Sequence, residues 1–180
     1  MVYVFLADGF EEIEAISPID ILRRAGVSVQ TVGVTGKTVT GSHGIMITAD
    51  ITAGEIKLDD DLEMVVLPGG LPGADNLQKD DIVNKALKFA SDNNKYISAI
   101  CAAPKILGAA GLLTGKKATC FPGYEQELIG AEATGESVVT DGKIVTAKGA
   151  GVASLFGFEL VKVLKGQETA EKIAKAMQTP

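Results

Sequence analysis

Cys101 is the residue whose type and position most clearly suggest chemistry. It follows the apolar run 96–100, which predicts a buried strand, and precedes the small-residue stretch 102–110, which predicts a helix. This strand–turn–helix setting is typical of a nucleophile elbow. A thiol at a helix N-terminus loses its proton more easily, and the first N–H groups of the helix can bind a developing oxyanion. The same residues equally allow a cysteine that only fills a small apolar space in the core.

Glu14 is the candidate proton donor for that thiol. It closes the segment 9–14, which follows the predicted strand 2–7, and open α/β sheets place their sites at this end of the strands. Acidic residues in a first helical turn are usually surface groups that stabilise the helix dipole. Glu14 is flanked by Ile13 and Ile16, however, so we expect its side of the helix to be partly buried. A carboxyl in an apolar pocket stays protonated and can donate a hydrogen bond to a thiolate.

Gly69 and Gly70 form a third candidate, because they follow the predicted strand 64–67. Two glycines after a strand let the backbone approach a ligand and offer N–H donors to it. A tight turn without a ligand explains the same residues, so this motif is weak alone.

No cofactor and no metal are predicted. Residues 36–38 lack the glycine that a phosphate-binding loop carries five residues earlier, and residues 149–151 lack the third glycine of a dinucleotide loop. The soft metal ligands of the chain are His43, Cys101 and Cys120, which lack the paired short spacing of a zinc site. We expect His43 at the surface or in an interface, and Cys120 in the core.

The remaining segments alternate between strand and helix. They favour one domain over residues 1–180, an α/β three-layer sandwich with a mostly parallel sheet and a small β-hairpin within residues 33–50. Pro18 is expected to kink or break the helix predicted over residues 11–25, unless the first turn restarts there. The predicted strands are residues 2–7, 27–34, 64–67, 96–100, 117–119, 137–140 and 144–147, and the predicted helices are residues 11–25, 80–91, 102–110, 124–129, 151–164 and 167–177.

Composition and charge narrow the class of protein. Hydrophobic residues make up 46% of the 180 residues and the net charge is −6, so we expect a globular chain that repels phosphate backbones. No stretch reaches the roughly 20 apolar residues that a membrane span needs. We therefore expect neither nucleic acid nor a membrane as a partner. The N-terminal run lacks the basic residues of a secretory signal, and two cysteines cannot form a secreted-type disulfide framework. These features predict a cytoplasmic protein.

A set of short motifs, in this order and spacing, resembles the DJ-1/ThiJ/PfpI superfamily, and most closely its DJ-1-like branch. The resemblance covers roughly residues 2–166. Each motif is modest alone, and the combination is what makes the resemblance specific. The motifs are Asp8-Gly9-Phe10-Glu11-Glu12-Ile13-Glu14, Pro18-Ile19-Asp20-Ile21-Leu22-Arg23-Arg24-Ala25-Gly26, Val66-Leu67-Pro68-Gly69-Gly70, Ala99-Ile100-Cys101-Ala102-Ala103-Pro104 and Lys148-Gly149-Ala150-Gly151.

The resemblance implies a flavodoxin-like fold and a homodimer, which we expect to form through the first helix and the hairpin region 33–50. It assigns the reactive cysteine at a strained elbow to Cys101 and the protonated glutamate beside it to Glu14. It places the substrate-binding backbone groups at Gly69, Gly70 and Ala102. The implied activity is glyoxalase or deglycase chemistry, in which the thiolate attacks a small α-oxoaldehyde or its adduct.

Two alternatives stay open beside that activity. Other members of the family are described as oxidative-stress sensors or chaperones, which implies a Cys101 that is oxidised to sulfinate and stabilised by Glu14. A weaker alternative makes Cys120 a resolving thiol for Cys101.

The chain departs from the family pattern at two positions. Some DJ-1-like members carry a histidine where Phe121 stands, and the peptidase-like branch carries one where Ala102 stands. Without an imidazole, peptide hydrolysis loses its usual general base, so we do not expect a protease. Addition of a thiolate to an aldehyde needs mainly a nucleophile and a proton donor such as Glu14.

Overall fold

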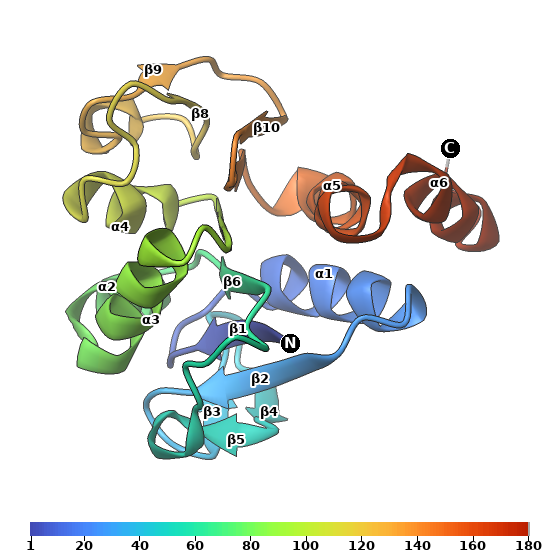
Figure 1. The fold of residues 1–180 in the computed structure, drawn as a ribbon. Helices are drawn as coiled ribbons and strands as arrows, with labels where there is room; N and C mark the ends of the chain where they lie inside the picture. Colours follow the sequence, from blue (N-terminus) through green and yellow to red (C-terminus); the bar gives the residue numbers. More distant parts are fainter. Residues whose placement is uncertain (180) are drawn as a thin grey trace.

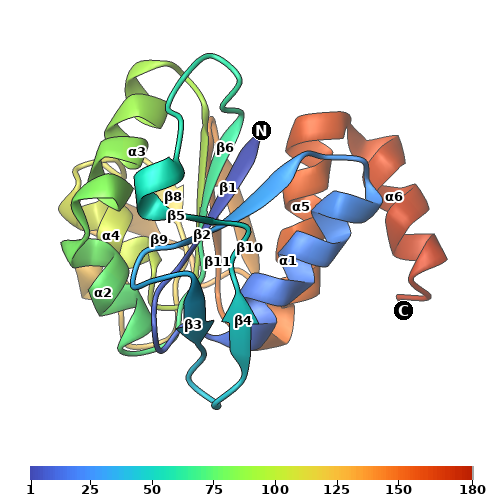
Figure 2. The same ribbon diagram turned by 90° about the horizontal axis from the view of Figure 1, so that it is seen from below.

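The computed structural model describes residues 1–179, and its centre is a seven-stranded sheet (Figures 1 and 2). All neighbouring strands of this sheet run parallel except the outermost pair, β10 and β11, which is antiparallel. Two small two-stranded sheets lie outside it. In spatial order the strands are β10 (Val138–Asp141), β11 (Ile144–Ala147), β7 (Tyr96–Ile100), β6 (Met64–Leu67), β1 (Val2–Leu6), β2 (Val29–Gly33) and β5 (Ile51–Thr52), and the small sheets pair β3 (Thr38–Thr40) with β4 (Met46–Thr48) and β8 (Lys117–Ala118) with β9 (Glu132–Ala133).

Helices cover both faces of the large sheet. Figure 2 shows α1, α5 and α6 on one side of the sheet and α2, α3 and α4 on the other. Among residues 1–179, none of the helices has the length and apolar character needed to cross a lipid bilayer. The α-helices are α1 (Glu12–Arg24), α2 (Gly73–Lys79), α3 (Asp81–Asp92), α4 (Pro104–Ala109), α5 (Ala153–Lys165) and α6 (Gln167–Ala176), and the 3₁₀ turns are Ala53–Glu55, Glu125–Glu127 and Ala150–Val152. The predicted three-layer sandwich with a mostly parallel sheet and a small hairpin is confirmed.

The core is divided by the sheet into two halves. Every residue of β1 is buried, because a central parallel strand is covered on both faces. Its alternate side chains enter different halves: Phe5 packs with the residues under α3 and α4, whereas Val4 and Leu6 pack with those under α1 and α5. This sharing of one strand between two cores explains the continuous apolar run at the start of the chain.

The expected break at Pro18 is wrong. Helix α1 continues through Pro18, although a proline inside a helix costs about 3 kcal/mol relative to alanine. The buried proline packs closely against Gly157 of α5, where an added Cβ would lie 3.1 Å from the Pro18 Cα. Packing of α1 on α5 thus holds the helix together where the local sequence favours interruption.

Smaller differences concern short elements. The helix predicted over residues 124–129 is the 3₁₀ turn Glu125–Glu127, and α2, β5 and β9 were not predicted. The predicted strands 137–140 and 144–147 are the antiparallel pair β10 and β11, and the hairpin expected within residues 33–50 is β3 and β4.

The topology determines where a site can form. Strands β1, β6 and β7 are parallel neighbours, so their carboxyl ends meet at one edge of the sheet. The segments that follow these three strands contain the candidate residues of the sequence analysis, and open sheets bind ligands at this edge.

Candidate functional site

The structure brings the five predicted site residues together. Cys101 and Ala102 directly follow β7, Gly69 and Gly70 follow β6, and Glu14 lies in the first turn of α1, after β1. Main-chain hydrogen bonds join these segments: the N–H of Glu11 donates to the Gly69 carbonyl at 2.9 Å. The loops after β1 and β6 therefore form one rigid support beside the thiol.

The backbone of Cys101 adopts the strained turn that the family resemblance implies. Its φ is +66°, in the left-handed region, which costs a residue with a side chain roughly 1–2 kcal/mol. Both of its main-chain polar groups are engaged. The N–H donates to the Ala147 carbonyl at 2.9 Å, and the carbonyl accepts from the N–H of Phe121 at 2.8 Å. These bonds hold the thiol in place between the strand and the helix.

Glu14 is a buried carboxyl in direct contact with the thiol. Its side chain is 1% exposed, it is hydrogen-bonded to Cys101, and its Oε2 accepts from the N–H of Gly69 at 2.9 Å. Burial raises the pKa of Glu14 to about 7, although the hydrogen bonds from Cys101 and Gly69 act in the opposite direction. The carboxyl therefore holds a proton at far higher pH than a surface glutamate.

Gly69 has no room for a side chain at this contact. An added Cβ would lie 2.5 Å from Glu14 Oε2 and 2.7 Å from the Cys101 Cβ. The glycine is thus required by the close approach of acid and thiol, which is more than the tight turn that explains it from sequence alone.

The pKa of Cys101 moves against the direction expected from a helix N-terminus. Burial, the charge of Glu14 and the hydrogen bond to Glu14 raise it to about 12, while the N–H groups of Ala102 and Gly70 act to lower it. Helix α4 is too short and begins too late, at Pro104, to outweigh burial.

Cys101 and Glu14 are best treated as one titrating pair. The pair loses its first proton near pH 7 and holds the second until about pH 12. In the state with one proton, the charge can rest on the sulfur while Glu14 stays neutral. That arrangement gives the sulfur three donors, namely the Glu14 carboxyl and the N–H groups of Ala102 and Gly70.

The thiol opens into a cavity of about 270 Å³. The sequence analysis did not predict four of the residues that line it. Ser42 comes from the β3–β4 hairpin and Tyr124 from the loop before a 3₁₀ turn. Glu11 and Leu71 carry no sequence feature that marks them individually as site residues. The cavity is lined by Glu11, Ser42, Gly70, Leu71, Cys101, Ala102, Phe121 and Tyr124.

His43 lies outside this cavity and binds an acidic neighbour instead. Its side chain is 69% exposed and its Nδ1 lies 3.0 Å from Glu12 Oε2. Burial opposes ionisation of Glu12, but hydrogen bonds from His43 and the N–H of Ile45 bring its pKa down to about 2. Ligand atoms of Glu11, Glu12 and His43 lie within 4.8 Å of one another. Because Glu12 already accepts the N–H groups of His43 and Ile45, this group anchors the hairpin to α1.

Cys120 is a core residue, as expected. It is buried and packs in the half of the core under α3 and α4, whereas Cys101 packs against the other half. Burial raises the pKa of the Cys120 thiol to about 11. The N–H of the next residue, Phe121, donates to the Cys101 carbonyl, so Cys120 lies near the same turn, and its role as a resolving thiol stays a prediction.

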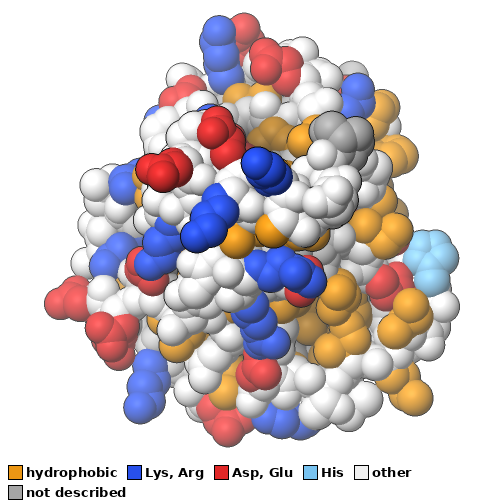
Figure 3. Space-filling view, turned by 90° about the vertical axis from the view of Figure 1, so that its right-hand side faces the viewer, with side chains coloured by type: hydrophobic (Ala, Val, Ile, Leu, Met, Phe, Trp, Pro, Cys, Tyr) orange, Lys and Arg blue, Asp and Glu red, His pale blue; other side chains and the backbone are white. Residues whose placement is uncertain are grey.

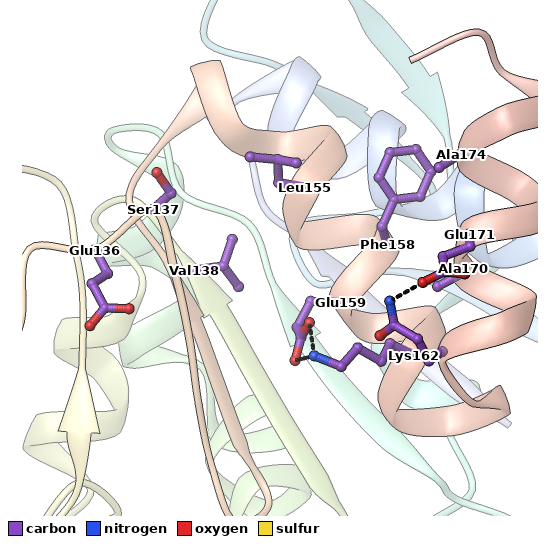
Figure 4. Close-up of a pocket in the computed structure, with 11 residues that line it drawn as sticks. Glu136, Ser137, Val138, Leu155, Phe158, Glu159, Lys162, Ala170, Glu171 and Ala174 are labelled. Atoms are coloured by element: carbon purple, nitrogen blue, oxygen red, sulfur yellow. Dashed lines mark hydrogen bonds and ion pairs between the residues drawn. The ribbon is translucent and has the colours of Figure 1, made fainter. Parts of the chain in front are cut away.

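A larger groove of about 580 Å³ lies between β10, α5 and α6 (Figure 4). Val138, Leu155 and Phe158 form its apolar wall, and Lys162 pairs with Glu159 at 2.9 Å within it. It is lined by side chains other than the predicted site residues, so the smaller cavity at Cys101 is the candidate for chemistry.

Comparisons with known proteins find relatives in sequence and in fold. The DJ-1/PfpI family model matches residues 1–163. Protein dj-1beta of Drosophila melanogaster is 34% identical over 177 residues, which cover 97% of this chain and 94% of that protein. The chain is 38% identical to protein DJ-1 homolog B of Arabidopsis thaliana over 96% of its own length and 40% of that longer protein. The structure of oxidized Toxoplasma gondii DJ-1 superposes with a TM-score of 0.93 at 35% identity, covering 98% of this chain and 96% of that one.

We predict that the proton lost near pH 7 comes from the sulfur. Thiolate absorbance in the ultraviolet will then rise with the first ionisation of the pair, near pH 7, although the separate pKa values assign that ionisation to Glu14 and hold the thiol proton until about 12. Glu14→Leu leaves the buried thiolate without its strongest donor, so the midpoint will move up by about one pH unit or more.

Cys101→Ser is the control for this titration, and the buried Cys120 will contribute only near its own pKa of about 11. A wild-type protein whose thiolate signal stays flat until strongly alkaline pH would show that Glu14 ionises first and that the thiol keeps its proton.

Proposed function

The chain belongs to the DJ-1/PfpI family, and from that premise we propose that it is a DJ-1-like enzyme acting on small α-oxoaldehydes or their adducts. Cys101 is the nucleophile and Glu14 carries the proton. The product of a free α-oxoaldehyde is the corresponding 2-hydroxy acid. The observation that carries the proposal is the hydrogen bond between a buried carboxyl and a partly buried thiol at the wall of a cavity.

The first step is addition of the thiolate to the aldehyde carbon. A sulfur–carbon bond forms, the carbonyl electron pair moves to oxygen, and that oxygen takes the proton of neutral Glu14 to give a hemithioacetal. The N–H groups of Gly70 and Ala102, which face the sulfur in the resting state, are then available to the oxygen.

The second step moves a hydrogen between two carbons. The Glu14 carboxylate removes the hydrogen on the former aldehyde carbon as a proton, which gives an enediolate. The proton then returns to the neighbouring carbon, while the hydroxyl proton of the former aldehyde carbon passes to the oxygen of the former ketone. The product is a thioester of the 2-hydroxy acid, and water hydrolyses it to the free acid and the thiol. Once the sulfur is bonded to carbon, Glu14 no longer shares its proton with a thiolate, and a buried carboxyl with a raised pKa suits both giving and taking a proton near neutral pH.

The enzyme proposal is tested by methylglyoxal consumption with lactate release. Cys101→Ser will reduce turnover to the uncatalysed background, and Glu14→Gln will reduce kcat by about 10²-fold or more because the amide cannot exchange a proton. Cys120→Ser is the matched control, since Cys120 lies in the core, and it will retain activity. Lactate formation that survives both Cys101→Ser and Glu14→Gln would exclude this mechanism.

A second candidate function is sensing of oxidants at the same thiol. A neutral Glu14 hydrogen-bonded to the sulfur could donate equally to a sulfinate oxygen, and one solved relative is described as oxidized. Each of two peroxide molecules would transfer one oxygen to the sulfur and leave as water. Both cysteines are free, which suits a reducing compartment, and we place the protein in the cytoplasm.

For this second function, mild hydrogen peroxide is expected to add two oxygen atoms selectively at Cys101. Intact-mass measurement with peptide mapping reads the site, and Cys101→Ser should gain none. Equal oxidation of Cys101 and the buried Cys120 would argue against a sensor. Oxidation of Cys101 to sulfonate with no accumulation of sulfinate would do the same.

We further propose that the protein is a homodimer through α1 and the β3–β4 hairpin. Ile13 and Ile16 on α1 are exposed, as are Ile45 and Met46 at the hairpin, where Met46 is 71% exposed. Hydrogen bonds from the hairpin to Glu12 bring the two elements side by side. Figure 3 shows hydrophobic side chains gathered near the single histidine, an arrangement that favours a protein partner.

Light scattering tests the dimer. The wild type will have twice the 18.7 kDa chain mass, and the double variant Ile45→Glu with Met46→Glu will have the mass of one chain. Ile129→Glu is the control, because Ile129 is similarly exposed and lies away from α1 and the hairpin. A wild-type protein that is monomeric at micromolar concentration contradicts the proposal.

A further inference from the structure

Phe121 is fixed to the catalytic turn while its ring lies in the cavity. Its N–H donates to the Cys101 carbonyl at 2.8 Å, so the two backbones cannot move independently. The side chain is 48% exposed and lines the cavity. The ring lies against Gly149, where an added Cβ would be 3.3 Å from the Phe121 Cδ2. One side of the phenyl ring therefore packs against the Gly149 backbone, and the exposed part of the ring faces the cavity beside the thiol.

Tyr124 extends this apolar wall and is itself held in place. Its N–H donates to the Phe121 carbonyl at 3.1 Å, and its ring lies 5.7 Å from the Lys105 Nζ. The Lys105 side chain is 12% exposed and paired with Asp75. A cation that is fixed by an ion pair and placed over an aromatic ring restricts the ring. The wall is thus formed before a ligand arrives.

The cavity offers a polar side and an apolar side, which would contact different ends of a ligand. Backbone donors at Gly70 and Ala102, with Cys101, can engage the aldehyde end. The substituent on the ketone carbon would then contact the side chains of Leu71, Phe121 and Tyr124. Apolar surface and aromatic rings favour another ring over a single methyl group.

Charge restricts the substituent further. The Glu11 side chain lies at the same cavity, is only 17% exposed, and accepts a hydrogen bond from Ser42 at 3.1 Å. A carboxylate on the substituent would be repelled by Glu11. A neutral substituent can therefore pack against the apolar wall without being repelled by Glu11.

We propose that Phe121, with Leu71 and Tyr124, makes this site selective for neutral α-oxoaldehydes that carry an aryl group over methylglyoxal. The inference rests on the proposed attack by Cys101 and names the substrate class of that site. Phe121 is a specificity-determining residue here, at the position where some members of the family have a histidine.

Alkylation of Cys101 by two matched α-bromoketones tests the wall without requiring turnover. Phenacyl bromide and bromoacetone differ in phenyl against methyl, and with both the sulfur–carbon bond forms as bromide leaves. Rates come from intact mass and are divided by the rates with glutathione, which removes intrinsic reactivity. The wild type will favour phenacyl bromide by about tenfold or more, and Phe121→Ala will lose most of that preference.

Phe158→Ala is the matched control, because Phe158 lines the distant groove between β10, α5 and α6, and it will keep the wild-type preference. Circular dichroism confirms that each variant is folded. A wild-type preference that is absent, or that is unchanged in folded Phe121→Ala, overturns the inference.

Turnover of phenylglyoxal and methylglyoxal separates this inference from the proposed function. Cys101-dependent turnover of both aldehydes with a kcat/KM ratio that falls in Phe121→Ala supports both. Absent turnover together with a bromoketone preference that depends on Phe121 would reject the enzyme and support the aryl-selective wall. Turnover with equal kcat/KM for the two aldehydes in wild type and Phe121→Ala would support the enzyme and reject the wall.

Discussion

The hydrogen bond between Glu14 and Cys101 is the interaction around which the site is built. Burial of these two groups does not favour folding by itself, because burial opposes the charged form of each. Sharing one proton resolves the conflict, since the pair carries a single charge that backbone donors can surround. The nucleophile and its acid thus come from one physical arrangement, which supplies a thiolate and a neutral proton donor at the same pH.

Close backbone approach makes that arrangement possible. Gly69 carries no side chain, so acid and thiol can meet across it, and the positive φ of Cys101 points the sulfur toward the same place. The left-handed turn is strained, and the surrounding hydrogen bonds to Ala147 and Phe121 maintain it. Three parallel strands that end at one edge bring these segments together from distant parts of the sequence.

Sequence alone could reveal the site in outline and most of the fold. The alternation of apolar runs with helical spacing identified β6 and β7 to the residue, and Cys101, Glu14 and the glycines stand where strands end. Helix α1 was less predictable, because its passage through Pro18 depends on packing against Gly157, a residue far along the chain. A thiol pKa lowered by the helix N-terminus alone was a local expectation. Burial and the charge of Glu14 raise that pKa, so a thiolate near neutral pH depends on the proton shared with Glu14. The sequence also could not predict Ser42 and Tyr124 as site residues, because only the tertiary structure brings them to the cavity.

After the first ionisation of the pair, the remaining proton rests on Glu14, and infrared difference spectroscopy locates it directly. Glutamate labelled with carbon-13 distinguishes carboxyl from carboxylate, and subtraction of Glu14→Gln isolates the signal of this one side chain. On the alkaline side of the pair's first ionisation, the protonated carboxyl band of Glu14 will persist, and it will disappear only when the second proton leaves. A Glu14 band that has already changed to carboxylate after the first ionisation would instead place the remaining proton on sulfur and leave Cys101 a thiol at neutral pH.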